Sequence, residues 1–366
     1  MKLFTLLLVI TAVPGLSQFS TGFKSITRFD SSRPPVEKQG DKEHGRIIQI
    51  NVWYPSQKTE NRMTFRDYVG LAGLELDSSL NNDWYTLGLN RYFSWPESVK
   101  FEKKKFIDFI EREVPMNASK NAPGLVEKFP LIILVHGYAA DYAFVAEKLA
   151  SNGFVVMHVP VKGTLQTELD YQEKGLESQV LDYEYGLCVL KSEFPVFTNE
   201  IGVAGFSFGG QSAVAIALRN NNVKAIVSLD GGIGSAFGAQ LLRAQSFYDV
   251  KKLNQPLLHL YNARDSYADL SWIKAAPQRS RWLVAMKNME HGHFTSFGML
   301  NSWLPGIMGK DAPDPGRGYE AVMELTGKFF TRLIKNKMPV NENFFAEVMK
   351  KNGWIKKTIE KSEFIS

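Results

Sequence analysis

The chain has 366 residues, of which 44% are hydrophobic and 22% charged, a composition typical of a globular protein and not of a disordered or fibrous one. Its formal charge of +5 is modest for this length, and no basic stripe is interleaved with aromatic residues, so nucleic acid is not an expected partner. Cys188 is the only cysteine, which excludes an internal disulfide, and its apolar neighbours predict a packing role.

The first 17 residues have the pattern of an export signal. Lys2 supplies a positive start, Leu3 to Val13 is apolar, and the small residues Gly15 and Ser17 suit signal peptidase. The apolar run is too short to span a bilayer, and no other segment approaches that length. We therefore expect an exported protein, periplasmic or secreted, without a transmembrane segment and with its mature terminus at Gln18.

The elements that follow alternate between strands and helices. Ile47–Tyr54 reads as an antiparallel strand near a sheet edge, and residues 56–127 read as a helical insertion rich in aromatics. Short apolar runs then predict buried strands at Leu131–Val135, Phe154–Val159, Ile201–Ala204, Lys224–Leu229, Leu257–Tyr261 and Trp282–Met286. Helices are predicted at Phe101–Glu113, Asp141–Ser151, Gln172–Ser192, Ser207–Arg219, Ser266–Ala275 and Tyr319–Lys335. This order predicts an α/β fold with a mostly parallel, doubly wound sheet over residues 18–337 and a helical extension over 338–366.

Residues 205–209 read Gly-Phe-Ser-Phe-Gly, a G-x-S-x-G pentapeptide between a predicted strand and a predicted helix. A serine on such a turn projects its hydroxyl above the sheet, and the flanking glycines relieve crowding. The context predicts that Ser207 is a nucleophile.

A serine nucleophile needs a base and a carboxylate that orients the base. His291 and His293 follow the last predicted strand, where the base arrives in a chain ordered serine, acid, histidine. Asp230 and Asp265 each follow a strand and compete for the role of the acid. The residues alone leave both choices open.

His136-Gly137-Tyr138 ends a predicted strand in a turn that commonly shapes an oxyanion loop. The expected donors are the backbone N–H groups of Tyr138 and Phe208, with the His136 side chain structural. His291-Gly292-His293 also has the spacing of some metal sites, but no third ligand accompanies it. We expect no metal and no cofactor.

These motifs resemble the α/β-hydrolases, and among them the platelet-activating-factor acetylhydrolase and dienelactone hydrolase-like esterases, from about Gly22 to Leu300. The resemblance rests on the segment from Ile47 to Gln57, on Lys128–Ala140 (K-F-P-L-I-I-L-V-H-G-Y-A-A), on Leu149–Val156 and on Gly205–Gly210. In that family the acid follows the strand after the nucleophile helix, which implies Asp230. The family's H-x-x-F-x-x-F pattern matches His291, Phe294 and Phe297 and implies His291 as the base, although Ser296 stands where the family often has Asp.

The resemblance implies an exported serine hydrolase that cleaves carboxylic esters of acyl or lipid-like type. The expected partner is a small-molecule ester, and the oligomeric state is open. Two rivals are an exported peptidase of the same fold and a relative that binds ligands without turnover.

Overall fold

The computed structural model describes residues 19–366 apart from 38, 40–41, 75–83, 95–102, 112–113, 278–279 and 308–313. The expected signal peptide at residues 1–17 lies outside the described residues, so export and cleavage stay predictions.

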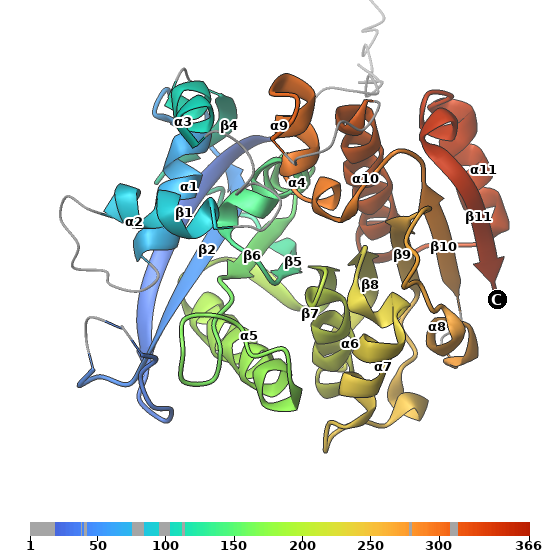
Figure 1. Ribbon diagram of the computed structural model, residues 1–366, viewed down its shortest axis with the longest axis horizontal. Helices are drawn as coiled ribbons and strands as arrows, with labels where there is room; N and C mark the ends of the chain where they lie inside the picture. Colours follow the sequence, from blue (N-terminus) through green and yellow to red (C-terminus); the bar gives the residue numbers. More distant parts are fainter. Residues whose placement is uncertain are drawn as a thin grey trace, which may run out of the picture.

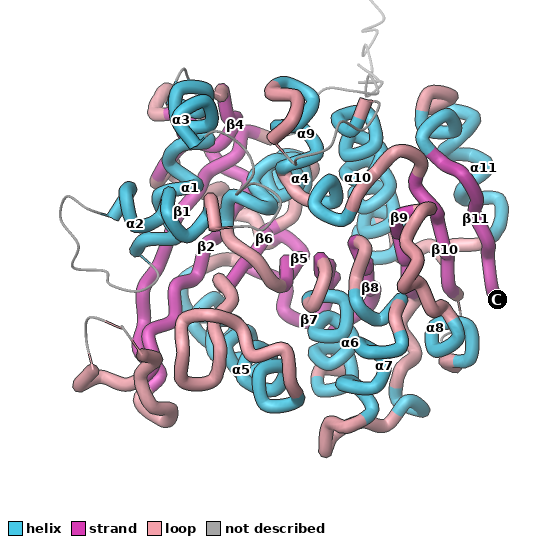
Figure 2. The backbone as a smooth tube through the Cα atoms, in the orientation of Figure 1, coloured by secondary structure: helices cyan, strands magenta, loops and turns pink. Residues whose placement is uncertain are grey.

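A sheet of eleven strands runs through the centre of the described chain (Figures 1 and 2), in the order β11-β10-β9-β8-β7-β5-β6-β2-β1-β4-β3. The strands are β1 Ser20–Asp30, β2 Arg46–Ser56, β3 Arg62–Thr64, β4 Pro115–Lys120, β5 Phe129–Val135, β6 Val155–Val159, β7 Val196–Phe206, β8 Val223–Leu229, β9 Leu257–Asn262, β10 Arg281–Met286 and β11 Ile359–Ile365. Strands β6, β5, β7, β8, β9 and β10 are mutually parallel. Every residue of β5, β6 and β10 is buried, as the apolar runs predicted for strands covered on both faces.

Helices cover both faces of this sheet (Figure 1). One face carries α4 Ala139–Ser151, α10 Pro315–Phe330 and α11 Glu342–Lys351, and the other carries α5 Glu173–Glu193, α6 Gly209–Arg219 and α7 Ala236–Arg243. Two shorter helices are α8 Ser271–Ala275 and α9 Phe297–Trp303. Two hydrophobic clusters fill the layers, one for each face. The doubly wound sheet is therefore confirmed.

The insertion at residues 56–127 is not purely helical, contrary to our expectation. Its helices α1 Phe65–Leu74, α2 Trp84–Tyr92 and α3 Lys103–Glu111 lie between β3 and β4 in the chain. Strand β4 pairs in parallel with β1, a strand that the sequence analysis missed, and β3 pairs with β4. The insertion thus extends the sheet as well as covering it.

The C-terminal extension is also only partly helical. After α11 the chain forms β11, which pairs antiparallel with β10, and Phe364 stacks on the buried Trp282 with ring centroids 4.7 Å apart. Glu360 and Lys361 of this strand are exposed at the sheet edge. Because these charged residues interrupt the apolar pattern, the sequence analysis did not predict a strand here.

Two smaller findings complete the fold. Cys188 is exposed on α5, so the prediction of a packing role was wrong. Among the helices that the structure describes, none is long and apolar enough to cross a membrane.

A buried ion pair ties the start of β2 to α5. Nε and Nη2 of Arg46 each lie 2.7 Å from a carboxylate oxygen of Asp182, and both side chains are almost fully buried. Nη1 of Arg46 donates to the carbonyls of Gly163 and Thr164. The guanidinium therefore replaces its lost hydration with fixed acceptors.

Candidate active site

Ser207 occupies a strained turn between β7 and α6. Its φ of 54° is in the left-handed region, which non-glycine residues rarely adopt. A Cβ on Gly205 would collide with the backbone of Gly209, and one on Gly209 would collide with the carbonyl of Val135. The glycines are therefore required by close backbone packing, and the turn lifts the serine to the carboxyl edge of the sheet.

Three adjacent strands end in the same way. His136 after β5 has φ 81°, Ser207 after β7 has φ 54°, and Asp230 after β8 has φ 45°. Since carboxyl ends of parallel strands meet at one edge, these turns gather the polar residues there.

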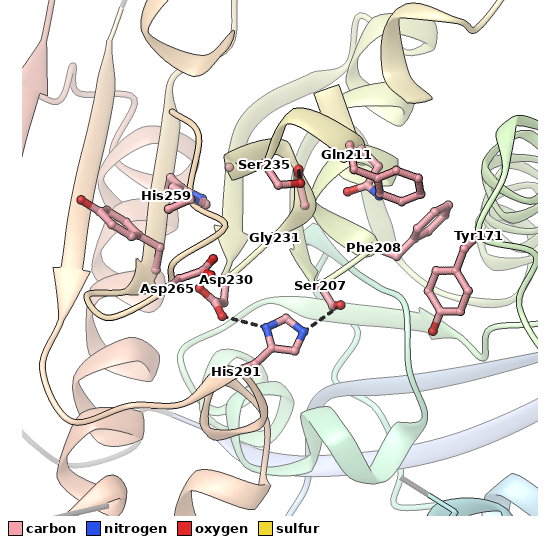
Figure 3. A pocket seen from close by; sticks show the side chains of 15 residues that line it. Tyr171, Ser207, Phe208, Gln211, Asp230, Gly231, Ser235, His259, Asp265 and His291 are labelled. Atoms are coloured by element: carbon pink, nitrogen blue, oxygen red, sulfur yellow. Dashed lines mark hydrogen bonds and ion pairs between the residues drawn. The ribbon is translucent and has the colours of Figure 1, made fainter. Parts of the chain in front are cut away.

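The structure brings together Ser207, His291 and Asp230 from three distant segments (Figure 3). Nε2 of His291 lies 2.9 Å from Oγ of Ser207, and Nδ1 lies 2.7 Å from Oδ2 of Asp230. The imidazole packs on the buried ring of Phe206 with centroids 4.7 Å apart. The histidine can thus receive a proton at Nε2 while the carboxylate accepts from Nδ1.

Asp230 is fixed on both carboxylate oxygens. Oδ1 accepts from the backbone N–H of Asn262 at 2.8 Å, and the N–H of Asp230 donates to the carbonyl of Leu260 at 2.7 Å. Its side chain is only 8% exposed. The carboxylate is therefore held in the orientation that meets His291.

Asp265, the competing acid, forms a turn instead. Its Oδ1 accepts from the backbone N–H of Tyr267 at 2.8 Å, the bond of an Asx turn. Asp265 lies in the wall of the same cavity, but the imidazole of His291 is hydrogen-bonded to Asp230.

His293, the competing base, is buried beside the site. Its Nδ1 accepts from the backbone N–H of Glu290 at 2.9 Å, and burial lowers its pKa to about 4. Residues 291–294 form a 3-10 helix and not a strand, so the two histidines point to different partners. Within the described part of the chain, no cluster of three or more His, Cys, Asp or Glu side chains could hold a metal ion.

Of the two expected oxyanion donors, only Phe208 belongs to the wall of the cavity, at the N-terminus of α6. The N–H of Tyr138 donates instead to Oδ2 of Asp141 at 2.8 Å. Asp141 is buried, and burial raises its pKa to about 7. In this structure the Tyr138 amide is thus bound to a carboxyl group that the sequence analysis did not single out.

Asp141 also connects the turn at Tyr138 to the segment that carries His291. Its carbonyl accepts from the N–H of Ser296 at 2.7 Å and from Oγ of Ser296 at 3.0 Å. Ser296 stands where the resembling family often has Asp, and here it is hydrogen-bonded to the backbone of Asp141.

Among the described residues of the insertion, Arg91 and Tyr92 of α2 contact this region, and the Arg91 guanidinium lies 5.1 Å from the centroid of the Tyr138 ring. Tyr92 of α2 stacks on Phe297 with centroids 5.1 Å apart and an interplanar angle of 5°, and it meets the ring of Tyr138 edge-on at 6.5 Å. Phe294 and Phe297 are both buried, so the two phenylalanines of the H-x-x-F-x-x-F pattern anchor the segment that begins at His291.

His136 has the structural role that we expected. It is buried between Phe206 and Phe208, and burial together with the charge of His291 lowers its pKa to about 3. It stays neutral at physiological pH.

A cavity of about 260 Å³ opens beside the Ser207 hydroxyl. Besides the residues already described, its walls include Tyr171, Gln211, Gly231, Gly232, Gly234, Ser235, Phe237, His259, Tyr261 and Ala268. Sequence reasoning missed these residues because helices, a strand and loops that are distant in the sequence supply them, and no local motif marks such a wall.

Three comparisons place this geometry among known proteins. Residues 181–278 match the family model "BAAT / Acyl-CoA thioester hydrolase C terminal", a span that includes the serine turn and Asp230. A structure of ferulic acid esterase from Streptomyces cinnamoneus superimposes with a TM-score of 0.60 at 20% identity, over 90% of this chain and 94% of that one. No curated protein matches. The fold is that of the α/β-hydrolases, as the sequence predicted.

Proposed function

We propose that this protein is a serine hydrolase that cleaves carboxylic esters with Ser207, His291 and Asp230 as its catalytic triad. The observation that carries the proposal is the unbroken hydrogen-bonded chain from the Ser207 hydroxyl through His291 to Asp230, at the wall of a cavity. The finer resemblance to platelet-activating-factor acetylhydrolase and dienelactone hydrolase-like esterases is part of this proposal.

In the proposed reaction, Oγ of Ser207 bonds to the ester carbon while Nε2 of His291 takes the hydroxyl proton. The bond to the alkoxy oxygen then breaks, and the same proton passes to that oxygen, which releases the alcohol. Water next attacks the acyl-enzyme, a proton returns through Nε2 to Oγ, and the acid leaves. Asp230 holds the imidazole in the tautomer that both halves need.

The amide of Phe208 would donate to the oxyanion from the N-terminus of α6, where the helix dipole adds a favourable field. We propose that the Tyr138 amide supplies the second hydrogen bond by exchanging its carboxyl acceptor, Asp141, for the oxyanion. An uncharged Asp141 would favour this exchange, because a carboxylate repels the developing negative charge.

Thioester cleavage is a second candidate, favoured by the family model that matches residues 181–278. The same triad would attack a thioester carbonyl, and only the leaving group differs. The cavity beside Ser207 suits a short acyl group better than the lipid-like chain considered in the sequence analysis, because its volume of about 260 Å³ is below the range usual for ligand pockets.

The test uses substrates with one acyl group and three leaving groups: p-nitrophenyl acetate, acetyl thiocholine and p-nitroacetanilide. We expect turnover of the oxygen ester, lost in Ser207→Ala, and a fluorophosphonate probe that labels only the wild type. Preference for the thioester would move the assignment to the second candidate, and rapid cleavage of the anilide would indicate a peptidase. An inactive, unlabelled wild type would support a ligand-binding relative and refute the proposal.

Export belongs to the proposal as well and rests on the pattern of residues 1–17. N-terminal sequencing of the protein expressed with its own leader should start at Gln18. A terminus at Met1 in the mature protein would refute it.

A further inference from the structure

The cavity beside Ser207 has two chemically different sides. Figure 3 shows Phe208 and Tyr171 on one side of the serine hydroxyl, and Asp230, His259 and Asp265 on the other. A substrate whose carbonyl lies at Ser207 would therefore meet the rings of Phe208 and Tyr171 in one direction. In the other direction it would meet two carboxylates and the His259 imidazole, on which the ring of Tyr261 is stacked.

The aromatic side is preformed but not filled. The rings of Tyr171 and Phe208 meet edge to face, with centroids 5.6 Å apart and an interplanar angle of 86°. Tyr171 is 59% exposed, and Phe237, in the same cavity, is 54% exposed. Large rings exposed together next to a nucleophile offer contact surface that the protein itself does not use.

Backbone forms part of the remaining wall, at Gly231, Gly232 and Gly234. A Cβ at these positions would collide with Oγ of Ser228, with the amide of Gln211 and with the ring of His259, respectively. These glycines contribute backbone and no side chain of their own to the wall, so a flat group can lie against their peptide planes.

The volume limits what this space can hold. About 260 Å³ accommodates one ring with a short linker but not a long chain. Ring walls favour an aryl group over a saturated ring of the same size, because edge-to-face and offset contacts add to the burial of area.

We propose that the ester substrate carries an aryl group within a few atoms of the reacting carbonyl, bound against Tyr171, Phe208 and Phe237. This inference rests on the proposed function, since it deepens the assignment of the same site. The aryl group can belong to the acid or to the alcohol of the ester, and in both cases the ring is the part that the cavity recognises.

The experiment compares four esters. Methyl phenylacetate and benzyl acetate are isomers with the ring on the acid and on the alcohol, and methyl cyclohexylacetate and cyclohexylmethyl acetate are their saturated partners. Aryl and cyclohexyl esters differ slightly in intrinsic reactivity, so the readout is the aryl-to-cyclohexyl ratio of kcat/KM in wild type divided by that ratio in a variant. The variants are Tyr171→Ala and Phe237→Ala, with Tyr267→Ala as the control, because Tyr267 is 84% exposed and lies outside the cavity wall.

For one pair of esters, we expect the aryl-to-cyclohexyl ratio of kcat/KM to be about 3- to 10-fold higher in wild type than in Tyr171→Ala and Phe237→Ala. Tyr267→Ala should have the same ratio as wild type. The pair that responds shows which side of the ester carries the ring. Ratios that agree within about twofold between wild type and both variants would overturn the inference while leaving the esterase assignment intact.

A binding measurement separates the two proposals if no ester is cleaved. Phenylacetate and cyclohexylacetate are titrated into Ser207→Ala and followed by the shift in melting temperature. Selective stabilisation by phenylacetate, lost on adding Tyr171→Ala, would support the aryl site although the proposed function had failed. Equal effects of both acids would overturn it.

Discussion

Replacing Asp230 by Asn tests which carboxylate orients the base. Asp230 accepts two hydrogen bonds, from Nδ1 of His291 at 2.7 Å and from the N–H of Asn262 at 2.8 Å. An Asn has one acceptor and one donor end. If its oxygen keeps the bond to Asn262, its NH₂ faces Nδ1, and the imidazole must carry its proton on Nε2, where it can no longer receive one from Ser207.

The opposite orientation of the Asn points its NH₂ at the N–H of Asn262, which leaves two donors facing each other. That orientation keeps the productive tautomer but is disfavoured by the contact between two donors, so we expect the first orientation, in which the productive tautomer is lost, to dominate. The same substitution in a serine protease lowers kcat about 10⁴-fold, which corresponds to roughly 5 kcal/mol of transition-state stabilisation.

The matched control is Asp265→Asn. The side chain of Asp265 accepts from the N–H of Tyr267, and an Asn oxygen can replace that acceptor. We expect kcat within about threefold of wild type. The assay is steady-state hydrolysis of p-nitrophenyl acetate, with melting temperatures to show that both variants are folded. A folded Asp230→Asn variant that keeps a tenth or more of wild-type kcat would refute this reasoning, as would a collapse in Asp265→Asn.

Three further predictions concern the base, a buried acid and the buried ion pair. In the ester assay, His291→Ala should lose about 10⁴-fold or more in kcat. His293→Ala should keep most of the wild-type kcat and lose about 1–3 kcal/mol of stability in urea unfolding. The reverse pattern would assign the role of the base to His293. Because burial raises the folded-state pKa of Asp141 to about 7 from 3.8, folding favours the protonated form, and the resulting stability is present below pH 4 and lost as the pH rises towards 7. Asp141→Asn should therefore gain stability relative to wild type across that interval, by up to about 4 kcal/mol in urea unfolding at a series of pH values, and a difference that is constant with pH would contradict the buried acid. Arg46→Met should cost up to about 3 kcal/mol, because the buried Asp182 loses its bidentate partner while it keeps the ion pair with Arg33. A second change, Asp182→Leu, should recover part of that loss, since Arg33 retains its ion pair with Asp30; equal stabilities of the single and double variants would contradict the argument.

The sheet could be predicted from sequence where its strands are covered on both faces. The run Leu131–Val135 coincides with the apolar part of β5 because a strand buried on both sides has no polar positions. The sequence analysis missed β1 and β11 because they lie toward the sheet edges, where exposed charged residues interrupt the apolar run: Lys and Arg in β1, Lys and Glu in β11.

Within the candidate site, Ser207 could be recognised from sequence because the constraint on it is local: two glycines and a strand-to-helix junction. The residues alone did not decide between His291 and His293; the resemblance implied His291 through the H-x-x-F-x-x-F pattern, and the 3-10 helix over residues 291–294 gives the two histidines different partners. The hydrogen bond between the Tyr138 amide and Asp141 could have been predicted from the sequence, because a carboxylate at the third position of a helix commonly caps its start.

The stack of Tyr92 on Phe297 makes the insertion part of the packing around the candidate site. A segment that only covered an active site could be shortened or exchanged between proteins as a module. Here the ring of Tyr92 packs against both Phe297 and Tyr138, so trimming the insertion would remove a contact of the segment that carries His291. The insertion and the catalytic loops therefore have to vary together, and grafting this insertion onto another α/β-hydrolase would require transplanting its aromatic partners too.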